Sequence, residues 1–181
     1  MANVKSLLSA PAVIPAPATE GAQGPQHTSS ETYSKNILGP VFFTLSNLNV
    51  AGSNPEPADP SQSQYIVAAN EMFTVSVDIE FNTSPLSKLL MCLGTSITVD
   101  FGFEGFGANA SEADVKASIV TEKDVFKYTI SWTGTAEEIK LNSGLYEIGA
   151  VVTVGPGSNP CAQYIFGYGY IEEILLQVYP A

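Results

Sequence analysis

Residues 73–81 read FTVSVDIEF, and this stretch decides the fold class. Apolar side chains stand at every second position and alternate with Thr, Ser, Asp and Glu. A period of two places the apolar side chains on one face of a strand, and one-sided strands are typical of antiparallel sheets. The stretch therefore predicts a half-buried strand that lines a core.

The same period recurs along the chain. It is clearest in residues 96–104, SITVDFGFE, and in residues 126–132, FKYTISW. A single helical turn is expected at PLSKLLMCL. Further strands are expected at residues 41–47, 115–120, 138–141, 146–154 and 164–179.

The last of these segments is long for one regular strand. Its apolar positions change parity across Glu172 and Glu173, a change of register that a β-bulge absorbs. Many short strands with Gly and Pro turns and almost no helix predict an all-β fold, an antiparallel β-sandwich of Ig-like or jelly-roll topology.

The N-terminal part has a different composition. Residues 1–33 are rich in Ala, Pro, Gly, Ser, Thr and Gln, which predicts an extended N-terminal arm, and residues 34–181 are expected to form a single β-sandwich domain. Within the arm, the candidate apolar anchors for assembly are Leu7, Leu8, Val13 and Ile14.

The charge balance limits the classes of partner. With 18 acidic residues against 7 basic ones, all of them Lys, the net charge is -11. A field of that sign repels phosphate backbones, so nucleic acid is not expected as a partner. No apolar run is long enough to cross a bilayer, so no membrane span is expected either.

The residue inventory argues against an enzyme. The one histidine, His27, falls in the arm, which leaves the domain without the acid-base residue of Ser-His-Asp and Cys-His relays or of His-containing metal centres. We therefore expect no catalytic residues.

Four carboxylates on the polar faces of two predicted strands form a candidate metal site: Asp78, Glu80, Asp100 and Glu104. They would converge if the two strands paired. The ordinary interpretation is an acidic, solvated face. Calcium, which oxygen ligands alone can hold, is the alternative to having no cofactor, and two-carboxylate catalysis comes last.

Four aromatic residues share one face of the last predicted strand, with glycines on the other face: Tyr164, Phe166, Tyr168 and Tyr170. The ordinary interpretation is that the aromatic rings fill the sandwich core. The alternative is a ligand-binding platform on the surface, suited to sugars or other flat ligands.

The two cysteines, Cys92 and Cys161, are expected to be free thiols. The apolar stretch after Lys5 is interrupted by Pro11 and Pro15, which disfavours a secretory signal and favours a cytoplasmic location over a secreted one.

These observations favour a non-catalytic structural or interaction protein. It would assemble with copies of itself, or bind another protein, through the surfaces of the sandwich and the arm. The alternative is a small-ligand module that binds carbohydrate or calcium, and an unrecognised hydrolase is the third hypothesis.

Overall fold

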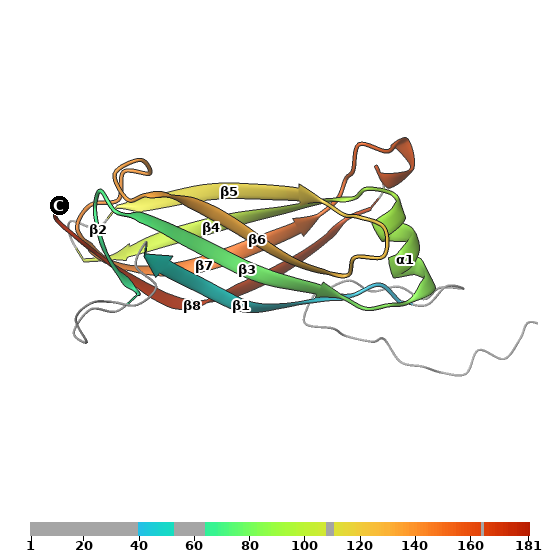
Figure 1. Ribbon diagram of the computed structural model, residues 1–181, viewed down its shortest axis with the longest axis horizontal. Coiled ribbons are helices and arrows are strands. Elements are labelled where there is room, and N and C mark those ends of the chain that lie inside the picture. Colours follow the sequence, from blue (N-terminus) through green and yellow to red (C-terminus); the bar gives the residue numbers. More distant parts are fainter. Residues whose placement is uncertain (1–39, 53–63, 108–110, 164) are drawn as a thin grey trace, which may run out of the picture.

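The computed structural model describes residues 40–52, 64–107, 111–163 and 165–181. They form two sheets that stack face to face, with strand orders β1-β3-β6 and β2-β8-β7-β4-β5 (Figure 1). The predicted β-sandwich is therefore confirmed. The arm and its four anchors lie outside the described residues, and the division at residue 33 stays a prediction.

The strands are β1 (Phe43–Gly52), β2 (Ile66–Ala68), β3 (Met72–Phe81), β4 (Ser96–Phe106), β5 (Glu112–Val120), β6 (Lys127–Thr135), β7 (Gly144–Val154) and β8 (Gly167–Tyr179).

The core lies between the two sheets, and the alternating stretches build it. On β3 the apolar side chains from Phe73 to Phe81 are buried, and so are those of β4 from Ile97 to Phe103. The rings of Phe73 and Phe103 meet edge to face with centroids 6.0 Å apart. The period of two in the sequence thus corresponds to an inner and an outer face on each strand.

The predicted bulge in β8 is confirmed. Ile148 of β7 pairs with Ile174, whereas Ala150 pairs with Ile171, so β8 holds an extra residue between them. Glu173 has a positive φ of 85° there. The short strand β2 was not predicted; it pairs in parallel with the end of β8 from Gln177 to Tyr179.

The strand predicted at residues 138–141 is wrong, because the structure has a turn there. The backbone N–H of Thr135 donates to Glu138 Oε2 at 3.0 Å, and that of Glu138 donates to Thr135 Oγ1 at 3.2 Å. These two side chains satisfy local backbone donors and so compete with strand pairing. Leu141 is nevertheless buried in the core.

The predicted helical turn is a short helix, α1 (Pro85–Cys92), which lies at one end of the sandwich (Figure 1). Ser84 caps it, because its Oγ accepts a hydrogen bond from the Ser87 backbone at 3.1 Å, and Pro85 suits the first turn. Leu90 and Met91 are buried against the core. In the part of the chain that is described, no helix has the length and apolar character to span a membrane.

Candidate functional site on the outer face of the larger sheet

The aromatic residues of β8 lie on the surface, so the expectation that they fill the core is wrong. Phe166, just before β8, is 68% exposed, Tyr168 is 46% exposed and Tyr170 is 57% exposed. Tyr164 lies outside the described residues. The inner face at this point is Gly169, and a Cβ there would lie 2.9 Å from the Phe43 ring and 3.0 Å from Leu45. Side chains of β1 in the opposite sheet thus occupy the space that larger residues on β8 would need.

Further exposed apolar side chains extend this surface along β8 and onto β7. Tyr170 pairs with Val151 of β7, and both point outward. Leu175 and Tyr179 continue the outward face of β8 beyond the bulge. We call this surface the aromatic stripe. It consists of Phe166, Tyr168, Tyr170, Leu175 and Tyr179 on and beside β8, with Leu145 and Val151 on β7.

Beside the stripe, the same face is hollowed over β4, β5 and β7. Gly102 pairs with Gly149 on one side and with Asp114 on the other, so the floor has no side chains at two neighbouring positions. A Cβ at Gly149 would lie 3.4 Å from the Tyr170 ring, which therefore walls the hollow. This acidic hollow has a volume of about 300 Å³, and its carboxylates come from Asp100, Glu104, Asp114, Glu147 and Glu172.

Two polar contacts organise the acidic hollow. Lys116 Nζ lies 3.0 Å from Asp100 Oδ1, with both side chains well exposed. The Tyr170 hydroxyl donates a hydrogen bond to Glu172 Oε2. This hydrogen bond, with smaller effects of burial and of the nearby carboxylates, raises the pKa of Tyr170 to about 12. The raised pKa extends the pH range in which the phenol is protonated and donates to Glu172 to above pH 10.

The four carboxylates predicted as a metal site are not brought together. Asp78 and Glu80 belong to β3 in the smaller sheet, whereas Asp100 and Glu104 belong to β4 in the larger one. The two strands do not pair, so the condition for convergence is not met. Within the described ranges, no group of three or more His, Cys, Asp or Glu residues is placed to hold a metal ion.

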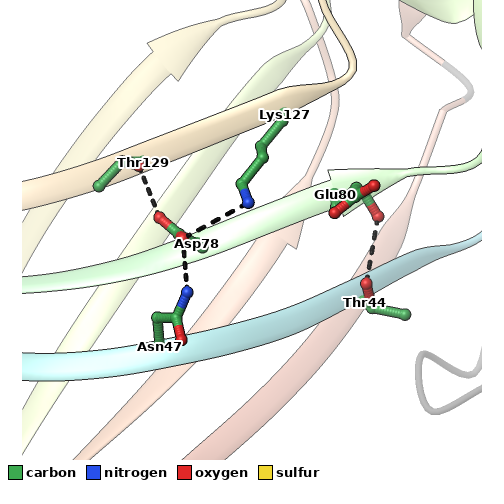
Figure 2. Close-up of polar contacts among 6 residues, drawn as sticks. All are labelled: Thr44, Asn47, Asp78, Glu80, Lys127 and Thr129. Carbon is green, nitrogen blue, oxygen red and sulfur yellow. Dashed lines mark hydrogen bonds and ion pairs between the residues drawn. The ribbon is translucent and has the colours of Figure 1, made fainter.

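Asp78 instead ties three strands of the smaller sheet together (Figure 2). Its carboxylate accepts hydrogen bonds from Thr129 Oγ1 at 2.6 Å and from Asn47 Nδ2 at 2.8 Å, and Lys127 Nζ lies 3.9 Å away. The Thr129 hydrogen bond, then the Asn47 hydrogen bond and the Lys127 charge, lower the pKa of Asp78. Figure 2 also shows that Thr44 Oγ1 bonds the backbone carbonyl of Glu80, at 3.5 Å. Asp78 therefore has a structural role in this sheet.

Three carboxylates of the acidic hollow were not predicted as site residues, those of Asp114, Glu147 and Glu172. They come from β5, β7 and β8, which are far apart along the chain, and only the strand order brings them beside Asp100 and Glu104. The two cysteines are free, as predicted, and both are exposed.

No family model matches the sequence, and no curated protein matches it significantly. Among solved structures, a β-glucosidase from Listeria innocua in complex with glucose is similar over 76% of this chain, with 13% identity and a TM-score of 0.38. The matched region spans only 16% of the β-glucosidase chain. AggA, the major subunit of aggregative adherence fimbriae type I from Escherichia coli, is similar over 82% of this chain and 100% of its own, with 9% identity and a TM-score of 0.37. At these TM-scores the likenesses carry no argument about function.

Proposed function

We propose that this protein is a non-catalytic structural protein that assembles with copies of itself through the aromatic stripe. The observation that carries the proposal is the gathering of exposed apolar side chains on β8 and its neighbour β7. Contiguous apolar patches on a protein surface are typical of interaction sites, and aromatic residues are enriched in them.

The shape of the stripe favours a protein partner. It follows β8 from Phe166 to Tyr179 in two apolar parts, separated by the exposed Glu172 and Glu173, and at about 3.3 Å per residue a strand of that length extends over about 40 Å. A small ligand covers only part of such a surface. A second sandwich that presents the same stripe matches it in length and in apolar character, as a two-fold contact requires.

Charge sets a condition on this assembly. Two copies with a net charge of -11 each repel one another, and the acidic hollow adjoins the stripe. Added salt screens this repulsion and strengthens an apolar contact. We therefore expect the association constant to rise with salt concentration.

Light scattering coupled to gel filtration tests the proposal, from micromolar to near-millimolar protein and at low and high salt. The variant carries Tyr170→Ser and Leu175→Ser, at stripe residues that are 57% and 47% exposed. The matched control carries Val120→Ser and Met72→Ser, at residues 56% and 46% exposed on other strands. We expect the wild type and the control to associate equally, and the stripe variant to remain monomeric.

A wild type that stays monomeric at every concentration and salt level would refute homotypic assembly. Equal weakening of the stripe variant and the control would refute the role of the stripe.

The absence of catalysis and a location in the cytoplasm, which suits free thiols, are parts of the same proposal.

The acidic hollow supports a second candidate function, a module that binds carbohydrate. It combines a glycine floor, the Tyr170 ring and several carboxylates in one depression. Saturable binding on a glycan array would favour this function. The signal must be lost in an Asp114→Asn, Glu147→Gln variant if the hollow is the site.

A further inference from the structure

An apolar cavity of about 290 Å³ lies at the end of the sandwich where α1 packs. The lining combines residues from α1, from the start of β1 and from the segment that leads into β8. No charged side chain is among them, so the cavity has no charged group that could pair with an anionic or cationic ligand. The lining includes Val41, Phe43, Leu86, Leu89, Cys161 and Phe166.

The cavity is open at its rim. Leu89 on α1 and Phe166 before β8 are both among the exposed large apolar residues, although each also lines the cavity. Its volume is at the lower limit of the roughly 300 to 1,000 Å³ of pockets for drug-sized ligands. It thus has room for a few aliphatic side chains.

The start of the described chain lies at this cavity. Residue 40 is the first one described, and the next, Val41, is part of the lining. The 39 residues that precede it in the sequence carry the four apolar anchors at positions 7, 8, 13 and 14. The composition of residues 15–39, rich in Pro, Ala, Gly, Ser and Thr, is that of a linker. Fully extended at about 3.3 Å per residue, that linker measures about 80 Å, so its length allows the anchors to return to the cavity.

We propose that residues 7–14, LLSAPAVI, dock into this cavity on the same chain. The occupant is the chain's own segment because the tether makes docking intramolecular. A tether that can span the two sites gives an effective concentration on the order of 1 mM, which exceeds the concentration of neighbouring copies in a dilute solution. Docking covers the apolar rim at Leu89 and Phe166. Phe166 is shared with the aromatic stripe, whose other residues do not line the cavity.

Cys161 makes the proposal measurable, because its exposed thiol lines the cavity. Cys92 at the end of α1 is also exposed but is not part of the lining, so it serves as an internal reference. The measurement is the rate at which a small maleimide labels each thiol, followed by peptide mass spectrometry. Docked residues 7–14 would shield Cys161 and leave Cys92 unaffected.

Three full-length chains are compared. The test variant carries Ser in place of Leu7, Leu8, Val13 and Ile14. The control variant carries Ser in place of Ala10, Ala12, Ala16 and Ala18, which keeps the large apolar anchors. If the free segment binds with a dissociation constant of about 0.1 mM, an effective concentration of about 1 mM leaves roughly ten docked molecules for each undocked one. We therefore expect labelling of Cys161 to be about tenfold slower in the wild type and the control than in the test variant, at every protein concentration.

Three results would overturn the proposal. Equal rates at Cys161 in all three chains would mean that the anchors do not cover the cavity. Protection that grows with protein concentration would assign the cavity to the arm of a second copy. Parallel changes at Cys92 would show a general effect on the fold. Light scattering on the same samples reports assembly separately, so failure of one proposal is distinguishable from failure of the other.

Discussion

Replacement of Gly155 by Ala is expected to destabilise the protein far more than the same change at Gly107. Gly155 directly follows β7 and has a φ of +92°, and Gly107 has a nearly equal φ of +95°. Both substitutions therefore force an L residue into an unfavourable backbone region, at a cost of about 1–2 kcal/mol.

The surroundings of the two glycines differ. A Cβ at Gly155 would lie 1.9 Å from the carbonyl oxygen of Ile165, whereas ordinary contact begins at 3.4 Å, and no described atom lies within 4 Å of a Cβ at Gly107. The obstacle is backbone and cannot rotate away. Either Ile165 moves or the hydrogen bond of 2.7 Å from the Gly155 N–H to the Ser96 carbonyl is lost. We expect Gly155→Ala to lower the free energy of unfolding by about 4 kcal/mol or more, and Gly107→Ala by about 1–2 kcal/mol.

Equilibrium unfolding in urea measures both values. The lone Trp132 is a suitable fluorescence probe, because its ring packs on Phe73 with centroids 5.6 Å apart. The difference between the two variants isolates the steric contact, since the backbone penalty is common to both. Losses that agree within about 0.5 kcal/mol, the usual scatter of a neutral surface change, would refute the reasoning.

Three further predictions follow from the core and the polar contacts. Phe103→Ala removes a buried ring that packs on Phe73 and is expected to cost about 3–5 kcal/mol in urea unfolding, and a loss below 1 kcal/mol would contradict the packing. In an absorbance titration of the tyrosines, Glu172→Ala should bring the pKa of Tyr170 down from about 12 toward 10, and Tyr170→Phe should remove one tyrosine that ionises far above 10. Because the pKa of Tyr170 is raised on folding, its contribution to stability is complete below pH 10 and is lost as the pH rises through the folded-state pKa. An unchanged absorbance titration in Glu172→Ala would show that the hydrogen bond is absent. Because the pKa of Asp78 is lowered, its contribution to stability is present above its ordinary pKa of 3.8 and is lost as the pH falls below that value. Asp78→Asn should therefore lose less stability than the wild type as the pH falls from about 5 to well below 3.8. An equal loss would contradict the three contacts.

The fold class and most strands could be predicted from local sequence. In residues 73–81 each apolar side chain is two positions from the next, and the geometry of a strand alone places them on one face. The bulge at Glu172 and Glu173 was visible for the same reason, because the parity of the apolar residues changes there. The strand predicted at residues 138–141 was wrong because the side chains of Thr135 and Glu138 bond each other's backbone N–H groups in a turn. The apolar Leu141 follows this turn and is buried without being part of a strand.

The candidate site required the tertiary structure. Along β8 the sequence shows aromatics on one face and glycines on the other, but not which face is inward. The side chains of Phe43 and Leu45 from the opposite sheet decide this, because they fill the space beneath Gly169 and leave the tyrosines outside. The acidic hollow likewise exists only because the strand order sets β5, β4, β7 and β8 side by side. Periodicity within a strand is a local property, whereas the direction of each face and the neighbours of each strand depend on contacts between residues far apart in the chain.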